Sequence, residues 1–207
     1  MKTAVLIDFD DVVFNTTRYK ILRDEYYKQK FDKKFWKRFK KYEHDYAVGE
    51  VKVFNLHDIL TDEELAITNQ HLKEMAPTLV YDDFAAFIEK IGGNRFAPII
   101  LTFGEKELQT TKIAAAGLDL PVIHTDIKNK AELMKGWRSD EGYRVGELDF
   151  GEVVLIDDRQ GNFIGFEQLP NARGFLMQRT AGLAYNLPKN VSIVGGFKEI
   201  DLAEGRE

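Results

Sequence analysis

The amino-acid sequence predicts an α/β protein: a parallel sheet with helices on both faces, and an all-helical segment inserted after the first strand. Three observations predict this. Short apolar stretches recur along the chain, helical stretches separate them over short loops, and residues 16–76 carry helical patterns without a strand. Strands that alternate with helices in this way are typical of parallel sheets that are covered on both sides.

The predicted strands are short and rich in apolar and β-branched residues. Residues 3–7 form the first, which ends abruptly at Asp8, as expected of a buried parallel strand. The later strands are predicted at residues 98–101, 121–124, 152–156, 174–177 and 191–194, and helices between them at 82–91, 105–116, from Asn129 onward and near 162–168. We expect Asp82 and Asn129 to cap their helices. No regular element is predicted for residues 138–150.

The inserted segment has the spacing of amphipathic helices. Aromatic residues recur at intervals of four and three, at Phe31, Phe35, Phe39 and Tyr42. Residues 61–64 have the sequence of a capping box, which predicts a helix start at that point, and Pro77 is expected to end that helix.

Composition excludes several classes of protein. The chain has 207 residues, a net charge of −5 and no cysteine, so disulfides, thiolate zinc sites, iron–sulfur clusters and a cysteine nucleophile are excluded. The four histidines lack metal-ligand spacing. No apolar stretch approaches the roughly 18 residues of a membrane span, and residues 4–7 are too short for a signal peptide. We therefore expect a soluble, cytoplasmic protein.

Positive charge is concentrated in residues 18–41, which contain eleven basic and three acidic residues. Three interpretations are open. The lysines can simply be the solvated face of amphipathic helices; they can form an electropositive lid for a nucleotide-like or polyanionic substrate, with Trp36 available for stacking; or they can bind nucleic acid or an anionic membrane. The acidic net charge disfavours a general nucleic-acid binder, without excluding it for this basic stretch.

Polar residues follow four of the predicted strands, where parallel sheets bind ligands. They are Asp8, Asp10, Thr102, Lys130, Asp157 and Asp158. Each residue by itself is common as a helix cap, turn former or surface charge. Carboxylates gathered at one edge would repel each other by about 1 to 4 kcal/mol per pair at roughly 4 Å, so we expect a cation among them. Oxygen ligands favour Mg²⁺.

Together with the apolar runs before them, these polar residues resemble the motifs of the haloacid dehalogenase (HAD) superfamily. The four similar motifs are Val5–Val12, Ile99–Thr102, Lys130 before a helix, and Val153–Asp158. The resemblance implies a Rossmann-like catalytic core of residues 1–15 and 80–207, and a C1-type helical cap of residues 16–79.

The resemblance also implies roles for the residues of these motifs. Asp8 would attack phosphorus to form an aspartyl-phosphate, and Asp10 would act as general acid and then general base. Thr102 and Lys130 would bind the phosphoryl oxygens. The Mg²⁺ ligands would be Asp8, the backbone carbonyl of Asp10, Asp157 and Asp158.

The sequence departs from the usual family pattern at two positions, with Asp11 where many members have glycine and Phe103 where a small or polar residue is more usual. Lys128 competes with Lys130 for the phosphate-binding role. We favour Lys130 because Asn129 and Glu132 are predicted to cap a helix that begins beside it.

The function predicted on this basis is that of an Mg²⁺-dependent phosphatase that hydrolyses a small phosphorylated metabolite, with no membrane partner. Asp10 argues against a dehalogenase, because the family's dehalogenases lack this second aspartate. Two alternatives remain open. The protein could be a phosphomutase, or a catalytically idle relative that binds an anionic partner through its basic cap.

Overall fold

The computed structural model describes residues 2–180 and 186–202, which fold into two compact units. The sheet unit consists of residues 1–13, 81–102 and 120–207, and the helical unit of residues 14–80 and 103–119. The helix that follows the second strand therefore packs with the helical unit. The division into a catalytic core and a C1-type cap stays a prediction, and residues 1, 181–185 and 203–207 of the predicted core lie outside the described residues.

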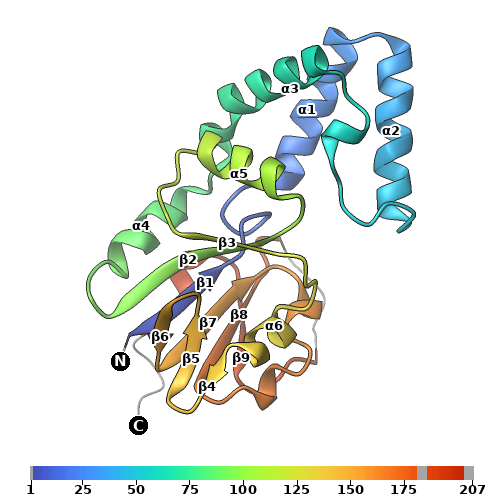
Figure 1. Ribbon diagram of the computed structural model, residues 1–207. Coiled ribbons are helices and arrows are strands. Elements are labelled where there is room, and N and C mark those ends of the chain that lie inside the picture. The colour runs from blue at the N-terminus through green and yellow to red at the C-terminus, as the bar shows by residue number, and fades with distance from the viewer. Residues whose placement is uncertain (1, 181–185, 203–207) are drawn as a thin grey trace. The chain divides into compact units, whose positions relative to one another are not determined.

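The sheet unit is built on six parallel strands in the order β3-β2-β1-β7-β8-β9 (Figure 1). Their bounds are β1 Thr3–Ile7, β2 Phe96–Phe103, β3 Val122–Thr125, β7 Glu152–Asp157, β8 Ala172–Met177 and β9 Val191–Val194. Ile7 lies opposite Ile100 on β2 and Ile156 on β7. The carboxyl ends of these three strands thus meet at one edge, and the predicted α/β fold is confirmed.

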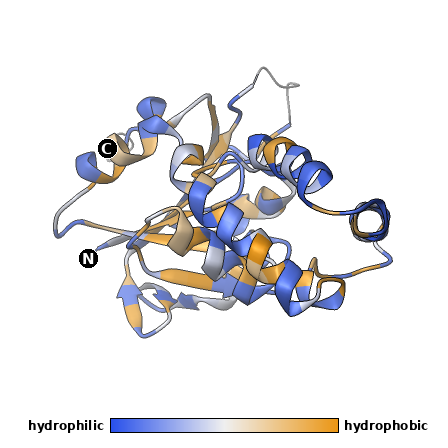
Figure 2. Ribbon diagram, turned by 90° about the horizontal axis from the view of Figure 1, so that it is seen from above, coloured by the Kyte–Doolittle hydropathy of each residue, from blue (hydrophilic) through white to orange (hydrophobic). Residues whose placement is uncertain are grey.

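The strands are apolar because both faces of the sheet are covered. Every residue of β1 is buried, and the strands are among the hydrophobic ribbons of Figure 2. One face packs against α6 (Lys130–Gly136), where Met134 joins Leu6 and Leu155 in a single core. Elsewhere in this unit, α4 (Asp82–Lys90) packs its aromatic side chains against Phe197. Burial on both faces explains apolar runs without alternation.

Residues 138–150, for which no element was predicted, form a three-stranded antiparallel sheet. Its strands are β4 Arg138–Ser139, β5 Gly142–Val145 and β6 Leu148–Phe150. Tyr143 and Val145 are buried while Arg144 between them is exposed, the alternation of a half-buried strand. Gly146, in the two-residue turn between β5 and β6, has φ +62°. Strands of two to four residues are too short for periodicity to reveal.

Two smaller predictions were wrong. Residues 162–168 are not one helix but parts of two 3-10 turns, Gln160–Phe163 and Phe166–Gln168, separated by Gly165 at φ +83°. Asp82 does not cap α4: it is the first helical residue, and Tyr81 occupies the cap position without a side-chain hydrogen bond.

The helical unit contains α1 Thr16–Lys30, α2 Lys33–Ala47, α3 Asp62–Met75 and α5 Lys106–Ala115. The first helix has its C-cap at Phe31, and Asp32 caps the second by accepting from the backbone N–H of Phe35. The predicted capping box at Thr61 and Glu64 is present. Phe35, Phe39 and Tyr42 are buried on α2, as their spacing predicts, and Tyr27 packs edge-on against Phe35 and Phe39. Phe31, predicted in the same series, lies between the two helices and is half-buried.

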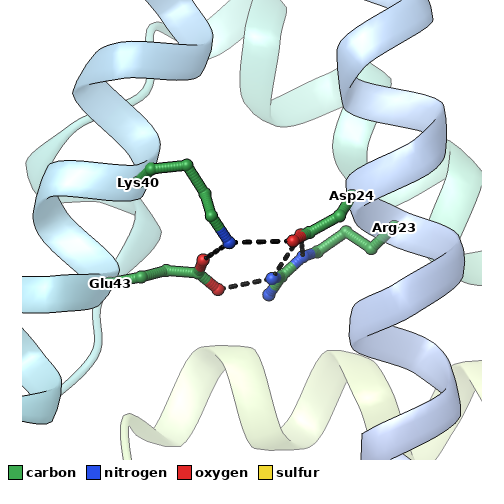
Figure 3. A network of polar contacts seen from close by, with 4 residues as sticks. All are labelled: Arg23, Asp24, Lys40 and Glu43. Atoms are coloured by element: carbon green, nitrogen blue, oxygen red, sulfur yellow. Dashed lines mark hydrogen bonds and ion pairs between the residues drawn. The ribbon is translucent and has the colours of Figure 1, made fainter.

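Some charged residues of α1 and α2 pair with each other between the helices, and others are exposed to solvent. Arg23, Asp24, Lys40 and Glu43 form a closed network between the two helices (Figure 3). Other lysines of these two helices, such as Lys30, Lys34 and Lys37, are exposed. Among the described residues, no helix is long and apolar enough to span a membrane.

Candidate active site

The centre of the site is a buried lysine that bridges two carboxylates. The Nζ atom of Lys130 lies 2.5 Å from Oδ1 of Asp8 and 2.6 Å from Oδ2 of Asp157. Lys130 and Asp157 are at most 1% exposed, and Asp8 is 7% exposed. Three motifs that lie far apart in the sequence are therefore joined directly at the carboxyl edge of the sheet.

Local structure places each of these side chains. Asp8 directly follows β1, and its backbone N–H donates to the carbonyl of Ile156 on the neighbouring strand. Lys130 is the first residue of α6, and Asn129 caps this helix as predicted, by accepting from the N–H groups of Ala131 and Glu132. A capped helix start holds the base of the lysine side chain in one place.

Asp157 is oriented from two directions. Its Oδ2 binds Lys130, while its Oδ1 accepts from the backbone N–H of Arg159 at 2.8 Å and from the side chain of Asn162 at 2.7 Å. Because both oxygens accept hydrogen bonds, the position of this carboxylate is fixed, and it in turn stabilises the charge of Lys130.

Three carboxylates of the site are close enough to share a cation. Asp8, Asp157 and Asp158 each offer an oxygen, and these oxygens lie within 4.8 Å of one another. Asp10 is not part of this carboxylate group; its predicted contribution is a backbone carbonyl, and that stays a prediction. A set of oxygen donors is the kind of site that Mg²⁺ prefers, so the residues present fit the ion that the fold family implies.

The pKa values of the residues in this site reflect an excess of negative charge. Burial raises the pKa of Asp8 well above its usual value, and neighbouring Asp157 adds to this, although Lys130 opposes it. Burial, with Asp157 and Asp11, raises the pKa of Asp158 to about 7. Burial alone would lower the pKa of Lys130, but Asp157 and Asp8 outweigh it and raise the pKa. One lysine does not neutralise this group, and a divalent cation would.

The loop after β1 turns sharply at Asp11, which has φ +57°. This is the left-handed region, which aspartate tolerates better than most residues other than glycine. The conformation accounts for the family's usual glycine here and for the acceptability of aspartate in its place. Asp11 therefore adds a negative charge beside the site, as its effect on Asp158 shows.

The remaining predicted residues are placed as follows. Thr102 is fully buried near the carboxyl end of β2, two residues beyond Ile100, and Phe103 is half-buried. Lys128 is exposed, in contrast to Lys130. The contrast favours Lys130 as the phosphate ligand. The roles of Thr102 and Lys130 in phosphate binding stay predictions.

The sequence has no match among protein-family profiles or curated proteins. Solved structures do match. A haloacid dehalogenase-like hydrolase from Burkholderia xenovorans LB400 has 15% identity and a TM-score of 0.68, over 95% of this chain and 93% of that one. A HAD phosphatase from Thermococcus onnurineus has 18% identity and a TM-score of 0.65, over 96% and 95%.

A third similar structure is the HAD-hydrolase YfnB from Bacillus subtilis bound to magnesium, with 12% identity and a TM-score of 0.58 over 96% of both chains. Haloacid dehalogenases are also among the similar structures. The chain therefore has the fold of the HAD-like hydrolases, as its motifs predict. At these identities the likeness establishes the fold alone.

Proposed function

We propose that this protein is an Mg²⁺-dependent phosphatase that hydrolyses a small phosphate monoester through an aspartyl-phosphate on Asp8. The observation that carries the proposal is the meeting of Asp8, Asp157 and Asp158 within 4.8 Å, beside the buried Lys130. A solved structure with the same fold is a phosphatase, and another is bound to magnesium.

In the first step of the proposed reaction, a carboxylate oxygen of Asp8 attacks phosphorus and the bond from phosphorus to the ester oxygen breaks. Asp10, two residues further on, gives a proton to the departing alcohol oxygen. In the second step Asp10 takes a proton from water, the water oxygen attacks phosphorus, and the bond from phosphorus to Asp8 breaks. Inorganic phosphate leaves, and both aspartates return to their starting states.

The other residues stabilise charge rather than form bonds. Lys130 is held charged by Asp157 and can attract the phosphoryl oxygens while it restrains Asp8, and the hydroxyl of Thr102 can donate to those oxygens. Mg²⁺ held by Asp8, Asp157, Asp158 and the carbonyl of Asp10 would screen the negative nucleophile from the negative phosphate.

The proposed substrate is a small phosphorylated metabolite, including nucleotide-like and polyanionic compounds. Exposed lysines on α1 and α2, among them Lys28, Lys33 and Lys37, raise the local concentration of anions around the protein. If they contribute in this way, kcat/KM for a phosphorylated substrate falls as salt is added, and replacement of these lysines by glutamine removes that dependence.

The test is release of inorganic phosphate from an aryl phosphate, with Mg²⁺ and with EDTA, beside Asp8→Asn. We expect hydrolysis only by the unchanged protein with Mg²⁺. Activity that survives both changes would contradict the mechanism. Halide release from 2-haloacids would favour a dehalogenase, and phosphate transfer between sugar positions a phosphomutase. Absence of any turnover, with salt-dependent binding of a polyanion, would favour the idle protein.

A further inference from the structure

We propose that Arg179, outside all four motifs, is a positioning residue that holds the β1 loop (residues 8–13) in the geometry that Mg²⁺ binding and phosphoryl transfer need. The inference rests on the proposed function for its kinetic part. Its structural part concerns the loop that carries Asp8 and Asp10.

The guanidinium group of Arg179 binds the loop directly. Its Nε and Nη2 atoms both donate to the backbone carbonyl oxygen of Val12, at 3.2 and 2.9 Å. Val12 itself is fully buried, two residues beyond Asp10. Arg179 follows β8 by two residues and is 167 positions away from Val12. No local sequence pattern links the two positions.

A second group of contacts holds the guanidinium in place. Nη1 and Nη2 of Arg179 pair with the two carboxylate oxygens of Asp83, at 3.2 and 3.0 Å. The guanidinium carbon lies 3.6 Å from the centre of the Tyr81 ring. The side chains of Arg179 and Asp83 are only 15% and 13% exposed. A planar fork that binds a carboxylate and stacks on a ring is a geometry that lysine cannot reproduce.

The carboxylate of Asp83 is fixed in turn. Its Oδ2 accepts from the backbone N–H of Phe197 at 2.8 Å. A Cβ atom added at Gly196 would lie 2.6 Å from the same oxygen, so a larger residue there would displace the carboxylate from its present position. Asp83 and Tyr81 thus hold the guanidinium group of Arg179 in a fixed position, from which it donates to the carbonyl of Val12.

Backbone hydrogen bonds hold the β1 loop at both of its ends, at Asp8 and at Val13, and Asp10 lies between them. At one end Asp8 donates its N–H to Ile156, and at the other Val13 accepts from the N–H of Tyr81. Between these bonds the chain passes through the left-handed conformation of Asp11. The bonds from Arg179 to Val12 hold the far end of this turn, and so determine where the carbonyl and carboxylate of Asp10 lie relative to Asp8.

The experiment compares the Arg179→Lys variant with the unchanged protein. Mg²⁺ binding is measured by isothermal titration calorimetry, aryl phosphate hydrolysis by steady-state kinetics, and folding by thermal melting. We expect Mg²⁺ affinity to fall by about 10-fold and kcat by about 10- to 100-fold, the range seen when a supporting contact of a metal site is lost. KM should change by less than about twofold, because the substrate contacts remain.

Arg173→Lys is the matched control. Arg173 is a half-buried arginine on β8 of the same unit, and it also donates to a backbone carbonyl, that of Leu202. In the register of the sheet Arg173 pairs with Val154, near the start of β7 and away from the carboxyl edge where the β1 loop begins, and we expect Mg²⁺ affinity and kcat to stay within about twofold of the unchanged protein.

Asp83→Asn is the second variant. It retains Arg179 but weakens its anchor, and it should shift Mg²⁺ affinity and kcat in the same direction by a smaller factor. The proposal is overturned if Arg179→Lys or Asp83→Asn folds and retains the affinity and kcat of the unchanged protein. It is also overturned if both variants fail to fold, because the role is then structural. If the unchanged protein binds Mg²⁺ but hydrolyses nothing, the proposed function fails, while the Mg²⁺ affinities still decide the positioning role.

Discussion

Two networks of charged residues in this protein differ in the balance between positive and negative charge. Between α1 and α2, two cations meet two anions: Arg23 and Lys40 with Asp24 and Glu43. At the carboxyl edge of the sheet, one cation, Lys130, lies among the carboxylates of Asp8, Asp157 and Asp158. The first network is balanced, and the second has an excess of negative charge.

The pKa values of the carboxyl groups differ between the two networks in the same way. In the helical network burial opposes ionisation, but Lys40 and Arg23 outweigh it and lower the pKa of Asp24. At the sheet edge, burial and neighbouring acids raise the pKa of Asp158 to about 7. A balanced network stabilises the fold. An unbalanced one is costly unless a further cation binds, and this cost is a reason to propose a metal site at the sheet edge.

Replacing the proposed nucleophile should give the largest effect. Asp8→Asn should lower kcat for an aryl phosphate by at least about 10³-fold, because the neutral amide is a poor nucleophile and cannot form the aspartyl-phosphate. Its free energy of unfolding should not fall, because a buried carboxylate with a raised pKa is removed. The opposite is expected in the balanced network, where the substitution should affect stability rather than the proposed site. Asp24→Asn should lower the free energy of unfolding by about 1–3 kcal/mol and leave Mg²⁺ affinity unchanged. Urea unfolding and calorimetry distinguish these outcomes.

Removing the cation of the unbalanced network should cost the most stability. Lys130→Met leaves Asp8 and Asp157 buried without their shared partner, and we expect a loss of about 3–5 kcal/mol in the free energy of unfolding. Urea denaturation measures it. A loss below about 1 kcal/mol would mean that the acids are neutralised in some other way, and the contrast between the two networks would be wrong.

Removing the buried cation of the balanced network should cost somewhat less. The side chain of Arg23 is 7% exposed, and its guanidinium lies 4.7 Å from the centre of the Phe39 ring. Arg23→Met should lower the free energy of unfolding by about 3 kcal/mol, since Glu43 and Asp24 retain Lys40. The affinity for Mg²⁺ should not change. A loss of Mg²⁺ binding in a folded Arg23→Met protein would show that the networks do not act separately.

Mg²⁺ should stabilise the protein through the sheet edge alone. At 100 times its dissociation constant, a ligand that binds only the folded state adds about 2.7 kcal/mol. Asp158→Asn should remove most of this gain, and Lys40→Met should retain it. Thermal melting with Mg²⁺ and with EDTA provides the measurement, and equal gains in the two variants would place the ion elsewhere.

The smallest effect is expected from the half-exposed lysine of the balanced network. The side chain of Lys40 is 41% exposed, so solvent screens its ion pairs, and Lys40→Met should cost less than about 1 kcal/mol. The cost should also depend on pH. Because the folded-state pKa of Asp24 is below its ordinary value, the stabilisation is present at pH 7 and is lost as the pH falls below about 4. A cost that is constant from pH 7 to pH 3 would contradict this.

Much of the fold could be predicted because its signals are local. The apolar run of residues 3–7, Asn129 ahead of α6 and the capping box at Thr61 each lie within a few residues of the structure that they predict. The antiparallel strands of residues 138–150 were missed because strands of two to four residues carry too little periodicity. Gly165 interrupts what the spacing of residues 162–168 indicated as one helix.

For the site, the residue types after the strands and the parallel order of the sheet were enough to bring Asp8, Lys130 and the 157–158 pair to one edge. Which atoms meet was decided by tertiary structure alone: Lys130 bridges two carboxylates, Asp157 is held by Asn162, and Arg179 reaches Val12. The physical reason is that side-chain contacts between distant segments depend on how the strands and helices pack, while caps, turns and apolar runs depend on neighbours along the chain.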